Sequence, residues 1–271
     1  MYWQLPCRQL DLGQRCYLAI INLTPDSFSD GGAFASPKDA IAYGEELLRQ
    51  GAQILDLGAE STRPNSKPIG HEEEWGRIAP VLAPLKKNNP GCVLSIDTRS
   101  PYVASLALES GADIVNDVTG FQNPDMLEAA KKSDCGLIAM RSRIESGHIV
   151  MPEYFEPAPK TANAAMRELE IIKNVLLTAS IEPDRILLDP GFGFGTTFLE
   201  DQSLWCALRE MPSLLDWPVE RFCIGISRKR FVAHKFGVQG NGSLDKKTDE
   251  LHSQAAEMGY KVFRTHSLPG H

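Results

Sequence analysis

Short apolar runs recur along the chain, each preceded by an amphipathic stretch that ends in glycine. Three copies are Gly51-Ala-Gln-Ile-Leu-Asp56, Gly111-Ala-Asp-Ile-Val-Asn116 and Gly259-Tyr-Lys-Val-Phe-Arg264. Glycine suits the position just past a helix, where a left-handed backbone is favourable without a Cβ. The run that follows is typical of a parallel strand buried on both faces. Each copy therefore predicts a helix end, a tight turn and a buried strand.

Further apolar runs complete a set of eight predicted strands, at residues 17–21, 93–96, 136–140, 186–188 and 222–226. Predicted helices alternate with them: one opens at Ser36 and Pro37, one follows Gly70, and the longest spans residues 161–179. Strand and helix alternate from end to end without an obvious linker. This pattern indicates a parallel α/β fold and a single domain over residues 1–271.

Polar side chains close nearly every predicted strand: Asn22, Asp56, Asp97, Asn116, Asp189, Ser227, Arg264 and His266. In a (β/α)₈ barrel the carboxyl ends of the strands meet around one cavity, whereas in a doubly wound open sheet they lie along an edge. The pattern favours the first arrangement, so we expect a (β/α)₈ TIM barrel. The sequence stops shortly after His266, and we expect the C-terminal eighth helix to be missing.

The amino-acid composition argues against some classes of binding partner and indicates a cellular compartment. A formal net charge of −7 argues against nucleic acid or an anionic membrane, because both reward clustered Lys and Arg. The six cysteines form no CxxC pair and suit a reducing compartment. The N-terminus lacks the layout of a signal peptide, and no apolar run approaches the roughly 18 residues of a membrane span. We therefore expect a cytoplasmic protein.

Two polar loops follow the first two predicted strands. The first, Asn22-Leu-Thr-Pro-Asp-Ser-Phe-Ser-Asp-Gly-Gly32, is long for a strand-to-helix connection, which is unusual unless the loop is a lid or a binding loop. The second, Glu60-Ser-Thr-Arg-Pro64, offers two hydroxyls and a guanidinium, which could clamp an anion. Either loop taken alone is equally consistent with an ordinary polar surface.

The remaining strand ends offer two kinds of chemistry. Asp97, Asn116 and Asp189 would supply buried acceptors, which suit a ligand with adjacent ring N–H and amino donors, although buried Asp and Asn often serve only as turn caps. Ser227-Arg-Lys229 and Arg264-Thr-His266 end the last two strands, where many barrels hold phosphate. A solvated cationic surface is the alternative interpretation of these two motifs.

Taken together, the motifs resemble one family. From about Leu18 to His266 the sequence is similar to the dihydropteroate synthases, the folate-pathway targets of sulfonamides; the matching motifs, in order, are Asn22-Leu-Thr-Pro-Asp-Ser-Phe-Ser-Asp-Gly-Gly, Glu60-Ser-Thr-Arg-Pro, Ser95-Ile-Asp-Thr, Asn116-Asp, Asp189-Pro-Gly-Phe-Gly-Phe-Gly, Ser227-Arg-Lys and Arg264-Thr-His. Such enzymes are (β/α)₈ barrels. They condense 6-hydroxymethyl-7,8-dihydropterin pyrophosphate with p-aminobenzoate and release pyrophosphate.

The resemblance implies a role for each matching position. Asp97, Asn116 and Asp189 would hold the amino-pyrimidine edge of the pterin. Lys229 would reach its ring carbonyl and ring nitrogen. The pyrophosphate would be held by Asn22, Arg63, Arg264 and His266, with Mg²⁺ bound near Asn22. The p-aminobenzoate position would be bordered by Thr62, Pro64, Phe194 and Ser227.

The resemblance also implies a reaction order. The carbon–oxygen bond ionises first, so fixed positive charge must neutralise the departing pyrophosphate before the amine attacks. Closure of the loops that carry Asp30 and Arg63 would complete the site and exclude water. The catalytic residues implied are Asp30, Arg63, Lys229 and Arg264.

Two departures from the family pattern stand out. After the fifth predicted strand the family carries a Met-His-Met type sequence whose sulfur lines the pterin pocket, and here the chain reads Met140-Arg141-Ser142. We expect Arg141 to introduce charge there and Ser142 to weaken the contact with the ring. The family also uses its last two helices in a homodimer interface; with the final helix missing, the oligomeric state stays open.

Three functions remain in view. The first is an active dihydropteroate synthase, which we favour because the pterin and pyrophosphate motifs are all present. The second is a non-catalytic or substrate-altered paralogue that binds pterin, suggested by Arg141, Ser142 and the short C-terminus. The third is another pterin-using barrel, such as a methyltetrahydrofolate methyltransferase domain, which has no reason to keep the anion site of Arg63, Arg264 and His266.

Overall fold

The computed structural model describes residues 1–24, 36–60, 69–145, 148–150, 152–155 and 162–270. Within them, eight parallel strands form one sheet in the order β10-β7-β6-β5-β4-β3-β12-β11. Their bounds are β3 (Cys16–Asn22), β4 (Ile54–Gly58), β5 (Val93–Asp97), β6 (Ile114–Asp117), β7 (Gly136–Met140), β10 (Ile186–Asp189), β11 (Cys223–Ile224) and β12 (Val262–Thr265). A parallel bridge between Leu188 and Phe222 links the two edges of the sheet. The sheet thus closes into a (β/α)₈-type barrel, and the predicted fold class is confirmed.

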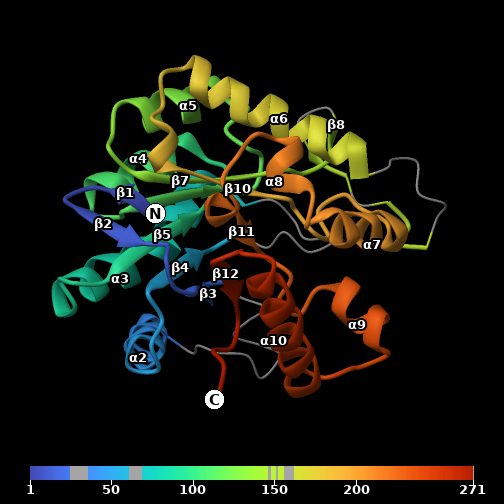
Figure 1. The fold of residues 1–271 in the computed structure, drawn as a ribbon. Helices are drawn as coiled ribbons and strands as arrows, with labels where there is room; N and C mark the ends of the chain where they lie inside the picture. Colours follow the sequence, from blue (N-terminus) through green and yellow to red (C-terminus); the bar gives the residue numbers. More distant parts are fainter. Residues whose placement is uncertain (25–35, 61–68, 146–147, 151, 156–161, 271) are drawn as a thin grey trace.

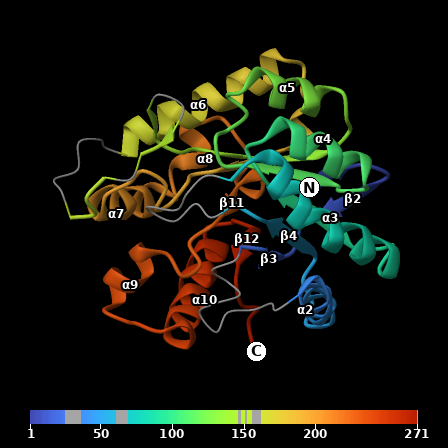
Figure 2. The same ribbon diagram turned by 180° about the vertical axis from the view of Figure 1, so that it is seen from behind.

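Helices surround the strands, as Figures 1 and 2 show from opposite sides. They are α2 (Pro37–Arg49), α3 (His71–Asn88), α4 (Pro101–Glu109), α5 (Pro124–Lys131), α6 (Ala162–Thr178), α7 (Phe198–Ala207), α8 (Met211–Leu214), α9 (Arg230–Phe236) and α10 (Asn241–Glu257), with short 3₁₀ turns η1 (Pro183–Arg185) and η2 (Val219–Arg221). Three of them begin with proline directly after a Ser or Asn N-cap, a position where the missing N–H costs nothing. Between β12 and residue 270 no helix is present, as the sequence predicted.

The inner faces of the helices carry the expected apolar stripes. In α6 the apolar residues Leu169, Ile172 and Leu176, at helical spacing, are all buried. In α2 the close approach to the barrel favours glycine: a Cβ at Gly44 would lie 3.1–3.2 Å from side-chain atoms of Leu85, Ile21 and Leu55. Apolar packing on this scale is the main source of stability for such a barrel.

A β-hairpin that the sequence analysis did not predict covers the N-terminal end of the barrel. It pairs β1 (Tyr2–Leu5) with β2 (Arg8–Asp11). Trp3 and Leu5 are fully buried against the lowest layer of barrel residues, and the Trp3 indole donates a 2.8 Å hydrogen bond to the carbonyl of Arg185. Because this end is sealed by apolar side chains, a polar ligand has access only from the other end.

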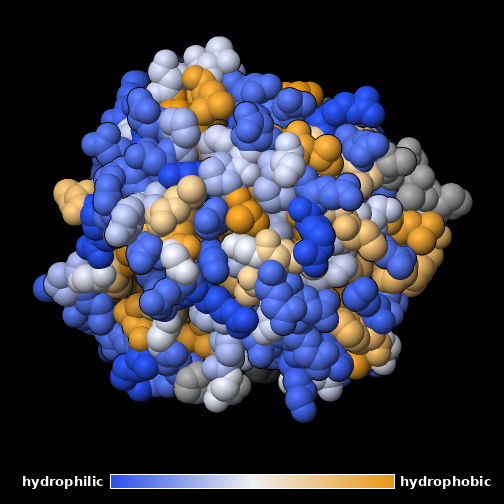
Figure 3. All heavy atoms as spheres, in the orientation of Figure 1, coloured by the Kyte–Doolittle hydropathy of each residue, from blue (hydrophilic) through white to orange (hydrophobic). Residues whose placement is uncertain are grey.

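The outer surface is mainly hydrophilic, with apolar residues scattered among the polar ones on the face shown in Figure 3. A second small hairpin, β8 (Ile144–Glu145) with β9 (His148–Ile149), follows β7. Across the described segments, no helix combines the length and apolar character needed to cross a lipid bilayer.

Candidate active site

The floor of the candidate site is a layer of interior residues that lies directly above an apolar one. Each strand contributes one side chain to the apolar layer: Leu18, Ile54, Val93, Ile114, Ile138, Leu187, Cys223 and Val262. Side chains two positions further along a strand point to the same face. The next layer is therefore Ile20, Asp56, Ser95, Asn116, Met140, Asp189, Gly225 and Arg264. Five of these eight residues carry an ionisable, amide or hydroxyl group, so the mouth of the barrel, at the carboxyl ends of the strands, is polar.

Arg264 ties three strands together across this mouth. Its Nε donates to Oδ2 of Asp56 at 2.7 Å, and its Nη2 donates to Oδ2 of Asp97 at 2.5 Å. Asn116 donates to the same Asp56 oxygen at 3.3 Å. The other Asp56 oxygen, Oδ1, is buried and has no hydrogen-bond partner among the described residues. Charge-assisted bonds of this kind fix the guanidinium in one geometry before any ligand binds.

The pKa values of two carboxyl groups of the site are raised toward neutral pH. Burial raises the pKa of Asp97 to about 6, and the positive charge of Arg264 opposes the shift. Burial likewise raises the pKa of Asp189 to about 6, opposed by the hydrogen bond that Gly191 N–H donates to it at 2.8 Å. Burial also raises the pKa of Asp117, which accepts hydrogen bonds from the backbone N–H groups of Thr119 and Phe121 and caps a turn. Strongly shifted groups around one cavity are characteristic of functional sites.

Lys229 is the cation that faces these carboxyl groups. Its pKa is lowered to about 8, first by burial and second by the nearby positive charge of Arg264, while Asp189 opposes the shift. Its Nζ lies 3.8 Å from the centroid of the Phe194 ring, a cation–π contact. Lys229 and Phe194, which the sequence separates by 35 positions, thus border the same space.

The glycine-rich turn after β10 presents Phe194 to the site. Gly191, Gly193 and Gly195 all have φ between 73° and 75°, which L side chains rarely adopt. A Cβ at Gly191 would lie 1.7 Å from the carbonyl oxygen of Arg141, so the turn packs directly on the chain that leaves β7. Backbone geometry therefore favours glycine at all three positions, and close approach does so at Gly191 and Gly195.

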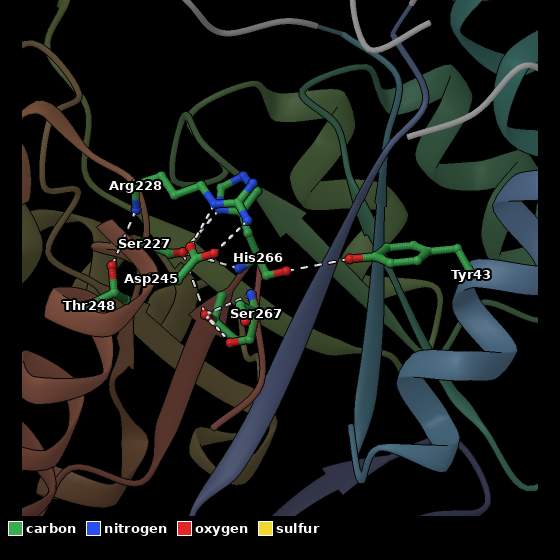
Figure 4. A network of polar contacts seen from close by, with 8 residues as sticks. Tyr43, Ser227, Arg228, Asp245, Thr248, His266 and Ser267 are labelled. Carbon is green, nitrogen blue, oxygen red and sulfur yellow. Dashed lines mark hydrogen bonds and ion pairs between the residues drawn. The ribbon is translucent and has the colours of Figure 1, made fainter. Parts of the chain in front are cut away.

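Ser227 and His266 meet at the rim, as Figure 4 shows. The Ser227 hydroxyl lies 3.0 Å from Nδ1 of His266 and accepts a 3.1 Å hydrogen bond from the His266 backbone N–H. Tyr43 of α2 donates to the carbonyl of His266 at 3.4 Å, and Arg228 forms a two-fold ion pair with Asp245 of α10. Sequence reasoning predicted Ser227 and His266 but missed Tyr43 and Asp245, because neither lies in a motif or at a strand end.

The structure corrects the expectation for Arg141. Met140 faces the barrel interior and packs with Val118 and Phe194, whereas Arg141 points outward and forms a 2.7 Å ion pair with Glu168 of α6. Neighbouring side chains leave a strand on opposite faces, so only one of two consecutive residues can enter the barrel. Arg141 and Ser142 both line a cavity of about 250 Å³ beside α6. The charge of Arg141 therefore stays outside the mouth of the barrel, and the side chain of Met140 faces it.

The other predicted site residues divide into two groups. Asn22 ends β3 in register with Gly58, which is in register with Asp97, so Asn22 belongs to the same rim. Asp30, Thr62, Arg63 and Pro64 lie outside the described residues. Asp56, which the sequence placed at a strand end without a role, proves to be the buried partner of Arg264.

The fold and this charged mouth define a (β/α)₈-barrel enzyme. The model of a family described as pterin binding enzyme matches residues 18–266. The dihydropteroate synthase of Neisseria meningitidis serogroup C is 34% identical over 275 residues, which cover 98% of this chain and 92% of that protein. The chain therefore belongs to the pterin-binding enzyme family, to which the dihydropteroate synthases belong.

Solved structures agree with this assignment. The dihydropteroate synthase of Xanthomonas albilineans with 4-aminobenzoic acid is 32% identical and superimposes with a TM-score of 0.86, covering 98% of this chain and 93% of the other. A second structure of that enzyme, in complex with 7,8-dihydropteroate, is 30% identical over the same shares of the two chains, with a TM-score of 0.82. The likeness therefore concerns the sequence as well as the fold.

Proposed function

We propose that this chain is a transferase that condenses 6-hydroxymethyl-7,8-dihydropterin pyrophosphate with p-aminobenzoate, giving 7,8-dihydropteroate and pyrophosphate. The observation that carries the proposal is the group formed by Asp97, Asp189 and Lys229 beside Arg264. Burial shifts the pKa values of all three residues toward neutral pH. Membership of a family whose relatives are dihydropteroate synthases supports the same reaction.

In this proposal the pterin lies on the floor of the mouth. Asp97, Asn116 and Asp189 accept or share hydrogen bonds with its amino-pyrimidine edge, and Lys229 donates to its ring carbonyl and ring nitrogen. The aromatic ring of Phe194 and the sulfur of Met140 supply the apolar contacts, since both pack into one small cluster there. A donor-rich heterocyclic edge satisfies buried acceptors that would otherwise be costly to keep dry.

The pyrophosphate lies at the rim, held by Asn22, Arg63, Arg264 and His266. Arg264 is already fixed by two carboxylates, so little reorganisation is needed when negative charge develops on the leaving group. Lys229 and Arg264 stabilise that charge, and Arg63 clamps it when the second loop closes. The p-aminobenzoate enters beside Thr62, Pro64, Phe194 and Ser227. Asp30, on the first loop, faces the pterin cation after ionisation.

Mg²⁺ is proposed as the metal, with Asn22 as its protein ligand. Within the described segments, no group of three or more His, Cys, Asp or Glu side chains is placed to hold a metal. The side-chain oxygen of Asn22 fits Mg²⁺ bound largely through substrate phosphates and water, which needs one or two protein oxygens. Mg²⁺ would supply charge neutralisation of the leaving group.

Several broader properties complete the proposal. Residues 1–271 act as one pterin-binding domain in the cytoplasm, where the six cysteines, all free in the structure, stay reduced. Sulfonamides, which share the arylamine of p-aminobenzoate, compete for its position. We propose a homodimer as the oligomeric state, which light scattering tests.

The direct test is release of pyrophosphate by the purified chain with 6-hydroxymethyl-7,8-dihydropterin pyrophosphate and Mg²⁺, with and without p-aminobenzoate. Formation of dihydropteroate together with pyrophosphate is the expected result. Binding of the pterin without turnover would instead identify a non-catalytic paralogue. Of the sequence arguments for that alternative, Arg141 carries less weight, because its side chain pairs with Glu168 outside the mouth.

A further inference from the structure

The turn that carries Ser227, Arg228 and Lys229 has a backbone conformation that L residues rarely adopt. Arg228 has a φ of 55°, in the left-handed region, where a Cβ crowds the backbone. Such a conformation persists only where the surrounding structure holds it. Since Arg228 lies between Ser227 and Lys229, its backbone sets the direction of both neighbouring side chains.

Two residues of α10 hold this turn. Asp245 accepts from Nε of Arg228 through Oδ1 at 2.7 Å and from Nη2 through Oδ2 at 2.8 Å. Thr248, three residues later and therefore on the same helix face, accepts a hydrogen bond from the backbone N–H of Arg228 at 3.4 Å. Figure 4 shows both side chains on α10 beside the turn. One helix thus anchors both the side chain and the backbone of Arg228.

The two flanking residues reach different parts of the site. Ser227 is hydrogen-bonded to His266 at the rim, and Lys229 extends under the ring of Phe194 toward Asp189. A change in the Arg228 backbone would move the serine and the lysine together. The turn therefore couples the proposed p-aminobenzoate position to the proposed pterin position.

We infer that Asp245 is a positioning residue for the proposed reaction, which orients Ser227 and Lys229 by clamping Arg228 against α10. The inference rests on the proposed function for the identity of the two substrates. An exposed ion pair such as Lys247–Glu250, on the same helix, links two mobile side chains and contributes little. The Arg228–Asp245 pair is different because it is two-fold and restrains a backbone in a rare conformation.

Steady-state kinetics of Asp245→Asn test this role, with Glu250→Gln as the matched control that removes an α10 carboxylate from a surface pair. Asp245→Asn should raise the KM for p-aminobenzoate and lower kcat, for a loss in kcat/KM of roughly tenfold to a hundredfold. Glu250→Gln should leave both constants unchanged. Arg228→Lys keeps the charge but breaks the two-fold geometry, and it should match Asp245→Asn. The double variant should then be no worse than either single one.

If the parent chain is active and Asp245→Asn has the same kcat and KM as Glu250→Gln, the inference is overturned and the proposed function stays intact. An inactive parent chain would count against the proposed function alone. The titration of Lys229, followed by NMR of the chain labelled with ¹³C-lysine, then decides the inference without turnover. Its pKa should shift in Asp245→Asn and Arg228→Lys but not in Glu250→Gln, and an unmoved Lys229 in all three would refute the clamp. If Asp245→Asn does not fold, Arg228→Lys carries the comparison.

Discussion

Arg264 forms an ion pair with Asp97 at 2.5 Å, and this contact joins the last strand of the barrel to one three places away in the sheet. The proposed anion site and the proposed pterin site consequently share a side chain. A substitution at either residue should therefore be measured against both parts of the substrate.

Arg264→Ala should weaken binding of the pterin pyrophosphate far more than binding of the free pterin alcohol. The diphosphate loses a direct cationic contact, on the order of 2–5 kcal/mol when a buried charge partner is truncated. The alcohol has no diphosphate, so its binding weakens only because Asp97 is no longer oriented by Arg264. Calorimetric titration with the two ligands measures both changes; equal losses would remove Arg264 from the pyrophosphate site.

Asp97→Asn should abolish pterin binding while the chain stays folded. The amide can no longer present two acceptors to the amino-pyrimidine edge, and it releases Arg264. Asp113→Asn is a suitable control, because Asp113 is a buried carboxylate that pairs with Lys86 and accepts from Leu94 outside the mouth. That control should lower the melting temperature without changing pterin affinity. Unchanged affinity in Asp97→Asn would refute the assignment.

Asp189 should cost stability as the pH rises. Burial raises its pKa to about 6 from an ordinary 3.8, so the folded chain binds the proton more tightly than the unfolded chain does. Ionised Asp189 therefore does not lower the free energy of unfolding below pH 4. Between pH 4 and 6 the free energy of unfolding falls, and the loss levels off at about 2–3 kcal/mol. Asp189→Asn, which avoids the charge, should be more stable than the parent at pH 7 but not at pH 4. Melting curves at the two values test this, and an equal difference at both would contradict it.

Glu168→Gln should lower stability and leave pterin affinity unchanged. Arg141 is almost fully buried, and the variant leaves its charge without a carboxylate partner; because Glu168 is 31% exposed, water offsets part of the loss, and we expect about 1–2 kcal/mol. Met140→Ala should show the opposite pattern, with weaker pterin binding from the lost contact beside Phe194. Denaturant titration and pterin titration of both variants separate the two effects. Loss of pterin affinity in Glu168→Gln would place Arg141 back in the site.

The strands and their polar ends were predictable because their determinants are local. A glycine, a short apolar run and a polar residue are contiguous in Gly111-Ala-Asp-Ile-Val-Asn116, and the structure places β6 over Ile114–Asp117. The N-terminal hairpin was missed because its burial depends on partners such as Gly136 and Arg185, which are far away in sequence. The residues around Trp3 do not show whether its side chain is buried against the end of the barrel or exposed in an ordinary turn.

The sequence by itself determined the barrel, its family and the polar residues that end its strands, since short-range periodicity and motif spacing encode them. Only the tertiary structure decided which neighbours meet. It turned Met140 inward and Arg141 outward through the alternation of a strand, it set Arg264 between Asp56 and Asp97, and it brought Asp245 to Arg228. These contacts join residues that lie 17 to 208 positions apart, and chain closure over such distances is fixed by packing of the whole barrel, not by any local segment.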